Sequence, residues 1–177
     1  MNEIEVKSLL TEQKYDELRK VLPQKFKKIN EDTITTVKFK PKDVRVRYSD
    51  KINELVFKDA DPTTVSRKEV TVNLQSLPDA HAMIAVLKEM GFQQDPSWVK
   101  RKEEFLCRFG GNEYTLSLQF IENFAYLLEA EIISDKDDVA THLPNLKKIL
   151  SDLGCEPIEP QQFKVKIEEY IKNNSKK

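Results

Sequence analysis

Cysteine and glycine are scarce in this chain, with two and four copies among 177 residues. Cys107 and Cys155 are too few for a disulfide framework and lack metal-site spacing, so we expect two reduced thiols in a cytoplasmic protein. His81 and His142 have no cysteine or histidine companions, which argues against a zinc site. The low glycine content is typical of a soluble protein dense in regular secondary structure.

The chain also has no excess of one charge, because 29 basic and 30 acidic residues give a net charge of −1. This balance favours neither nucleic acid nor an anionic membrane as a partner. There is no long apolar run and no signal-peptide pattern at the start, so we expect no membrane partner. The length predicts a single domain over 1–172, and the run Asn173-Asn174-Ser175-Lys176-Lys177 predicts a disordered C-terminal tail over 173–177. We expect a monomer or homodimer.

Periodicity predicts both strands and helices. Alternating runs rich in β-branched and aromatic residues predict strands over 2–8, 32–40, 43–49, 53–59, 65–74, 98–109, 113–121 and 125–134. Apolar residues at helical spacing predict helices over 11–22, 77–90, 135–153 and 160–172. The first helix is expected to stop before Pro23, and Pro144 is expected to kink or split the third.

The run Glu3-Ile4-Glu5-Val6-Lys7 near the start of the chain has the alternation of a strand with one charged face. Two carboxylates about 7 Å apart on one strand face repel each other unless a cation lies between them. A solvated surface strand is the simpler interpretation of this run alone. The same arrangement recurs in almost every later strand, which favours a functional surface.

Almost every later strand has one polar or charged face and one apolar face. The polar faces carry Arg45 and Arg47; Glu54 and Lys58; Arg67, Glu69, Thr71 and Asn73; Lys100, Lys102 and Glu104; Thr115, Ser117 and Gln119; and Glu129 and Glu131. Amphipathic helices need the apolar faces for packing, so the charged faces point away from the helices. Because an open eight-stranded sheet has two edges to protect and usually curls, we predict an α+β fold: an eight-stranded antiparallel β-barrel, or tunnel, with a charged lumen and external amphipathic helices.

A lumen of this composition is a poor hydrophobic core but suits a polyanion that carries metal ions. Guanidinium and ammonium groups bind phosphoryl oxygens. The candidate phosphate ligands are Lys7, Arg45, Arg47, Lys58, Arg67, Lys100 and Lys102. Paired carboxylates hold hard cations such as Mg²⁺ or Mn²⁺. The candidate metal ligands are Glu3, Glu5, Glu69, Glu129 and Glu131. We expect the cations of the lumen to repel one another when no ligand is bound.

These motifs, in this order and at this spacing, resemble the CYTH domain, or triphosphate tunnel metalloenzyme, family over essentially the whole chain. The matching motifs are Glu3-x-Glu5-x-Lys7, Arg45-x-Arg47, Lys58, Arg67-x-Glu69, Lys100-x-Lys102 and Glu129-x-Glu131. The resemblance implies a tunnel fold and metal-dependent cleavage of a small-molecule triphosphate. It also implies catalytic roles for Glu3, Glu5, Lys7, Lys58 and Glu129.

The resemblance leaves three functions open. We expect hydrolysis of inorganic tripolyphosphate or a nucleoside triphosphate. The alternative is a class IV-type adenylyl cyclase, which would convert ATP to cyclic AMP and pyrophosphate with the same phosphate clamp. A third possibility is a catalytically weak triphosphate-binding protein, because Gln119 replaces an aspartate that is common in the family and Thr71 replaces a frequent second acid. A thiamine triphosphatase is less favoured, since we find no obvious aromatic platform for its rings.

Overall fold

The computed structural model describes residues 2–59, 65–134 and 138–174, which form nine strands and four helices. The strands are β1 (Asn2–Leu10), β2 (Lys27–Lys40), β3 (Asp43–Tyr48), β4 (Asn53–Lys58), β5 (Ser66–Asn73), β6 (Gln93–Gln94), β7 (Trp98–Phe109), β8 (Asn112–Ile121) and β9 (Ala125–Ser134). The helices are α1 (Glu12–Lys25), α2 (Leu77–Glu89), α3 (Val139–Asp152) and α4 (Pro160–Asn174). Each of the eight expected strands and four expected helices has a counterpart among them.

Eight of these strands close into a barrel. Their hydrogen-bonded order is β3-β4-β5-β1-β9-β8-β7-β2, and β2 pairs back with β3 to complete the ring. All eight pairings around the ring are antiparallel. The short β6 adds a two-residue ladder to the end of β2. The prediction of an eight-stranded antiparallel tunnel is therefore confirmed.

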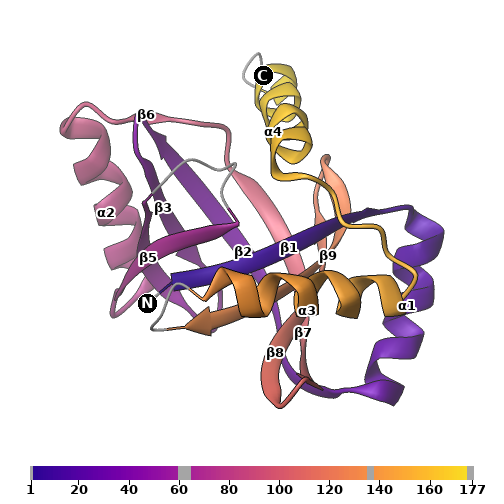
Figure 1. The fold of residues 1–177 in the computed structure, drawn as a ribbon. Helices are drawn as coiled ribbons and strands as arrows, with labels where there is room; N and C mark the ends of the chain where they lie inside the picture. Colours follow the sequence, from indigo (N-terminus) through magenta and orange to yellow (C-terminus); the bar gives the residue numbers. More distant parts are fainter. Residues whose placement is uncertain (1, 60–64, 135–137, 175–177) are drawn as a thin grey trace.

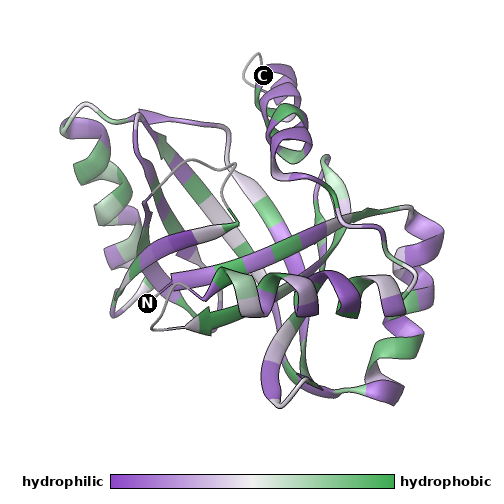
Figure 2. Ribbon diagram, in the orientation of Figure 1, coloured by the Kyte–Doolittle hydropathy of each residue, from purple (hydrophilic) through white to green (hydrophobic). Residues whose placement is uncertain are grey.

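The alternation of residues along each strand separates the lumen from the outer surface. On β1, Ile4 and Val6 are buried against the helices, whereas Glu3, Glu5 and Lys7 share the opposite face, and Figure 2 shows green and purple bands alternating along this strand. Residues paired directly across an antiparallel ladder lie on the same face of the sheet. The register therefore carries the charged face of β1 around the ring as the lining of the lumen.

The helices cover apolar faces on the outside of the barrel. Helices α1 and α3 cover the larger cluster, in which Leu22 and Leu150 pack against Ile4, Phe105 and Leu116 of the strands. Helix α2 lies at the opposite side of the molecule and covers a smaller cluster built on Val37, Phe39, Val46, Ala80 and Leu87 (Figure 1). Each fully buried aliphatic side chain of this kind contributes about 1.5–3 kcal/mol to folding.

Pro23 does not end its helix, and Pro144 does not split its helix in two. Pro23 lies inside α1, which continues to Lys25, and Pro144 lies inside the single helix α3. A proline costs a helix one backbone hydrogen bond and a steric clash. In α1 that loss falls in the last turn. In α3 it is offset because Leu146, Ile149 and Leu150, which follow the proline, are buried against the barrel.

Further boundaries also differ from the expectations. Strand β2 begins at Lys27, five residues before its expected start, and β6 was not expected. Helix α4 extends to Asn174, two residues into the tail expected over 173–177, and 175–177 lie outside the described residues. The expected third helix begins at Val139 in the structure, and 135–137 lie outside the described residues as well.

The helices leave part of the apolar outer face of the barrel uncovered. On β5, Val70 and Val72 are 46% and 52% exposed, although they share a face with residues that α2 covers on β3 and β4.

Over residues 2–59, 65–134 and 138–174, none of the helices combines the length and the apolar character that a membrane span requires.

Candidate active site

Four carboxylates gather on the lumen face of β1 and β9. The β1–β9 register places Glu5 opposite Glu131 and Lys7 opposite Glu129. Glu3, Glu5, Glu129 and Glu131 each contribute an oxygen to a group in which all ligand atoms lie within 4.8 Å of one another. Alternation along two adjacent strands thus places four acids at one point of the lumen.

The surroundings shift the pKa values of these acids in opposite directions. Burial raises the pKa of Glu5, but the cations Lys7, Lys58 and Arg67 lower it more strongly, so the pKa lies well below its ordinary value. Burial and the negative charges of Glu129, Glu3 and Glu5 raise the pKa of Glu131 well above its ordinary value. The lumen therefore stabilises some of these four charges and opposes others.

A divalent metal ion fits this group. Carboxylate oxygens are the ligands that Mg²⁺ and Mn²⁺ prefer, and a positive ion would relieve the mutual repulsion that raises the pKa of Glu131. Glu69, which was also expected to bind metal, lies outside the four-membered group. Its carboxylate forms ion pairs of 2.8 Å with Lys58 and 3.3 Å with Arg47 instead.

Three cations contact the acidic group directly. Lys58 pairs with Glu3, and Arg67 pairs with Glu5. Lys7 Nζ lies 2.6 Å from Glu5 and 3.5 Å from Glu129. Lys58 and Arg67 are buried, and they reach the acids from β4 and β5. Elements far apart in sequence thus bring cations and candidate metal ligands into the same site, as the sequence predicts.

The two arginines of β3 form ion pairs with acidic side chains, which offset their repulsion from the other cations of the lumen. Arg45 donates to both carboxylate oxygens of Asp43, at 2.7 and 2.8 Å. Burial raises the pKa of Asp43, but Arg45 prevails and lowers it to about 2. Arg47 lies 2.6 Å from Glu54. Asp43 was missed in the sequence, although the alternation of β3 places it on the same face as both arginines.

Two lysines of β7 line the opposite wall and differ in their partners. Lys102 Nζ pairs with Glu104 at 2.7 Å. Lys100 forms no ion pair within the described part of the chain, and burial lowers its pKa to about 8 despite the charge of Glu129. Lys38 was also missed: it lies opposite Arg45 in the β2–β3 ladder, and burial lowers its pKa. Arg101 points outward and pairs with Glu122.

The two positions that depart from the family pattern have different environments. Gln119 is 3% exposed and lies on the lumen face, where its amide nitrogen donates to Ser117 Oγ at 3.0 Å and to Glu129 Oε2 at 3.3 Å. It therefore contacts the acidic group from β8 as a hydrogen-bond donor. Thr71 is exposed and donates to Glu69 at 3.1 Å. It is not part of the four-membered group.

Comparison with known families agrees with this geometry. The CYTH domain model matches residues 1–153. The chain belongs to the CYTH domain family. Enzymes of this family act on triphosphates and generally require a metal ion, which agrees with the acidic group of the lumen. None of the curated proteins matches the sequence.

Solved structures share the fold at low sequence identity. The PH1819 protein from Pyrococcus horikoshii is 22% identical, with a TM-score of 0.71, over 89% of this chain and 93% of that one. An adenylate cyclase candidate from Vibrio parahaemolyticus is 18% identical, with a TM-score of 0.65, over 87% and 89%. The adenylyl cyclase candidate HpAC1 from Hippeastrum, described as having a dominant triphosphatase activity, is 13% identical, with a TM-score of 0.59, over 89% and 90%.

Proposed function

We propose that this CYTH domain hydrolyses a triphosphate, either inorganic tripolyphosphate or a nucleoside triphosphate, with Mg²⁺ or Mn²⁺. The observation that carries the proposal is the position of the four-carboxylate group inside a closed ring lined with cations. A surface cluster of acids would be solvated. Here the acids and the cations face the lumen of one closed ring of strands, where a metal-bound polyanion would satisfy both.

The residues divide into those that hold metal and those that hold phosphate. The metal ion would bind to Glu3, Glu5, Glu129 and Glu131. When bound, it would neutralise negative charge on the phosphoryl oxygens. Glu69, whose two cation partners face the lumen, would act through Lys58 and Arg47. The phosphoryl oxygens would bind Lys7, Arg45, Arg47, Lys58, Arg67, Lys100 and Lys102. Most of these cations already contact an acid, so the substrate must compete for them.

Hydrolysis then needs a water molecule in line with the terminal phosphoryl group. The water oxygen forms a bond to the terminal phosphorus and loses a proton to the solvent, and the bond from that phosphorus to the bridging oxygen breaks. The electron pair stays on the departing diphosphate, whose growing charge Lys7, Lys58 and the other lumen cations would stabilise. We assign Glu3, Glu5, Lys7, Lys58 and Glu129 to this catalytic centre.

A cyclase is the second candidate, because similar solved structures include proteins described as adenylyl cyclase candidates. The ribose 3′-hydroxyl of ATP would attack the α-phosphorus, and diphosphate would leave. The same cations would hold the phosphates, and only the nucleophile would differ. A weakly active binding protein is the third, since Gln119 contributes an amide rather than a charge to the acidic group.

One assay separates the three functions. The protein is incubated with tripolyphosphate, ATP or thiamine triphosphate, each with Mg²⁺ or Mn²⁺, and the products are identified by ³¹P NMR and chromatography. We expect orthophosphate from tripolyphosphate or ATP. Cyclic AMP with diphosphate would assign the cyclase function, and binding without products would assign the third.

We also propose a cytoplasmic protein, a monomer or homodimer, with the buried thiols Cys107 and Cys155 reduced.

A further inference from the structure

One acid of the lumen lies among the candidate phosphate ligands rather than in the four-carboxylate group. Asp43 is the first residue of β3, and alternation along that strand places it on the same face as Arg45 and Arg47. The β3–β4 register places it directly opposite Lys58. Its carboxylate also lies 3.9 Å from Arg67 Nη1. Asp43 therefore lies within reach of the same donors that a bound phosphoryl group would use.

The contact between Asp43 and Arg45 has the geometry of a bound anion. Arg45 Nε and Nη2 donate to the two carboxylate oxygens, at 2.7 and 2.8 Å. A guanidinium group binds carboxylate and phosphate through the same bidentate arrangement. The Asp43 side chain is 10% exposed. Although burial raises the pKa of Asp43, Arg45 lowers it to about 2, so the carboxylate is charged at neutral pH.

The other two arginines of the lumen are held differently. Arg67 has a buried Nε without a hydrogen-bond partner in the described part of the chain. Arg47 divides its ion pairs between two different acids. In Arg45, by contrast, a single carboxylate takes both Nε and Nη2. One side of the Arg45 guanidinium group is therefore already filled before any ligand binds.

We propose that Asp43 competes with phosphate for the Nε and Nη2 donors of Arg45, and so limits how tightly the lumen holds an anion. The inference rests on the proposed function and assigns a role to a residue outside the motifs that indicated it. A phosphoryl group that binds this side of Arg45 must replace two charge-assisted hydrogen bonds. The loss applies to the substrate and to the departing diphosphate alike, which favours product release. Asp43 acts through Arg45 and is a positioning residue.

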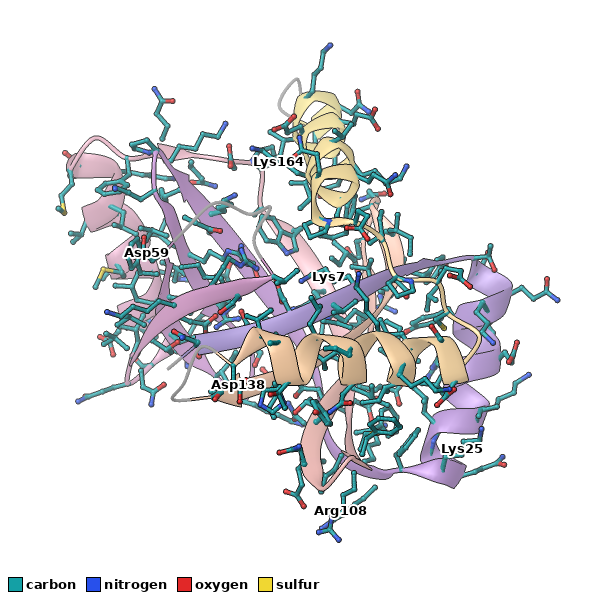
Figure 3. All side chains as sticks on the ribbon, in the orientation of Figure 1. Lys7, Lys25, Asp59, Arg108, Asp138 and Lys164 are labelled. Atoms are coloured by element: carbon teal, nitrogen blue, oxygen red, sulfur yellow. The ribbon has the colours of Figure 1, made fainter. Side chains whose placement is uncertain are left out.

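Two substitutions remove the competing charge. Asp43→Asn has the smaller effect on shape, because the amide keeps one oxygen that accepts from Arg45 but carries no charge. Asp43→Ala removes the contact altogether. Glu113→Gln is a matched control, because Glu113 forms an ion pair of 2.9 Å with Arg108. Figure 3 shows Arg108 at the tip of the β7–β8 hairpin, pointing away from the molecule and from Lys7.

The probe is diphosphate with Mg²⁺, because the proposed reaction releases diphosphate and does not consume it. In calorimetric titrations of the full chain, Asp43→Asn should lower the Kd for diphosphate about 10-fold, the lower end of the range for a hydrogen bond to a charged group. Asp43→Ala should lower the Kd as well, and Glu113→Gln should leave it unchanged. Without ligand, both Asp43 variants should melt at a lower temperature, because Arg45 loses its partner.

Arg45→Ala shows whether the effect passes through Arg45. In that background, Asp43→Ala should leave the Kd for diphosphate unchanged, because the donors for which Asp43 competes are gone. A gain in affinity of the same size with and without Arg45 would overturn the inference.

An unchanged or higher Kd in the two Asp43 variants would also overturn the inference, because a purely structural role lowers the melting temperature without tightening binding. If Asp43→Asn does not fold, Asp43→Ala decides alone. Failure of the proposed function is seen separately, because the wild-type protein would then release no orthophosphate from tripolyphosphate.

Discussion

Glu5 and Glu131 lie opposite each other in the β1–β9 ladder, and the protein shifts their pKa values in opposite directions. Glu5 lies next to Lys7 and Arg67, whereas Glu131 lies next to other acids. The same substitution to glutamine should therefore affect stability differently at the two positions.

Glu5→Gln should lower the free energy of unfolding by about 1.5–3 kcal/mol, because it removes the nearest carboxylate of Arg67 and Lys7 and leaves them only the longer contacts with Asp43 and Glu129. Glu131→Gln should lower stability less than Glu5→Gln in metal-free buffer, because burial and the neighbouring acids disfavour the charge of Glu131 and raise its pKa. Both variants should weaken Mn²⁺ binding. Urea unfolding measures the stability of each variant, and calorimetry measures its Mn²⁺ binding. Equal losses of stability in the two variants would contradict the opposite pKa shifts of Glu5 and Glu131.

Arg45→Ala should weaken triphosphate binding by about 1.5–3 kcal/mol, the range for hydrogen bonds to charged groups. The sequence suggested that removing a tunnel cation would relieve repulsion and leave stability unchanged or higher. The structure reverses this expectation, because the variant leaves the carboxylate of Asp43 without its bidentate partner. We now expect a lower melting temperature.

The double variant Asp43→Ala/Arg45→Ala provides the control, because it removes the whole ion pair. It should recover most of the lost stability and none of the lost affinity. A double variant that binds tripolyphosphate as tightly as the wild-type protein would show that Arg45 does not contact the substrate.

Lys100→Met should stabilise the ligand-free protein at pH 7 by about 1–3 kcal/mol and weaken triphosphate binding. The folded protein holds the proton of Lys100 only up to about pH 8, whereas the unfolded chain holds it up to about pH 10.5. Between these pH values the unfolded state binds more protons, so unfolding of the wild-type protein becomes more costly as pH rises. The advantage of Lys100→Met should therefore fade over this range.

Lys102→Met is the matched control for Lys100→Met, because Lys102 has an ion pair with Glu104. It should not stabilise the protein at any pH. Melting curves of both variants between pH 7 and about 10.5 test whether only Lys100→Met stabilises the protein. A Lys100→Met protein that is less stable than the wild-type at pH 7 would contradict the unpaired, buried environment assigned to Lys100.

Gln119→Asp should tighten Mn²⁺ binding, because it places a carboxylate where an amide now contacts Glu129. Without metal, the added charge should lower the melting temperature, and saturating Mn²⁺ should restore it. Differential scanning fluorimetry with EDTA and with Mn²⁺ measures both effects. A melting temperature that falls equally in the two buffers would exclude position 119 from the metal site.

The sequence predicted the closed barrel because period-two alternation in eight strands assigns each residue to one of two faces. Gln119, Lys100 and Glu129 lie on the lumen face for that reason. The predicted ends of helices and strands were wrong where packing outweighed local sequence preferences or where a strand was too short to show a pattern. Pro23 and Pro144 remain inside helices, and the two residues of β6 are too few to show a pattern.

The pairings inside the lumen could not be predicted from alternation. A face assignment places Arg45 and Asp43 together but does not say that they bind each other, and it places Glu69 with the acids although its partners are Lys58 and Arg47. Such contacts depend on the register between strands, which connects residues far apart in the chain. The position of α4 likewise depends on packing between the last helix and a distant turn, where Phe124 contacts Phe163 and Tyr170.

The central claim is that the carboxylates of β1 and β9 hold a metal ion that the reaction requires. The most direct measurement is the rate of orthophosphate release from tripolyphosphate as Mg²⁺ or Mn²⁺ is titrated into metal-free protein, with Glu3→Gln as the comparison. We predict saturable activation in the wild-type protein, no release in EDTA, and a much weaker response in Glu3→Gln. Equal release in EDTA, or an unchanged metal response in Glu3→Gln, would contradict the account.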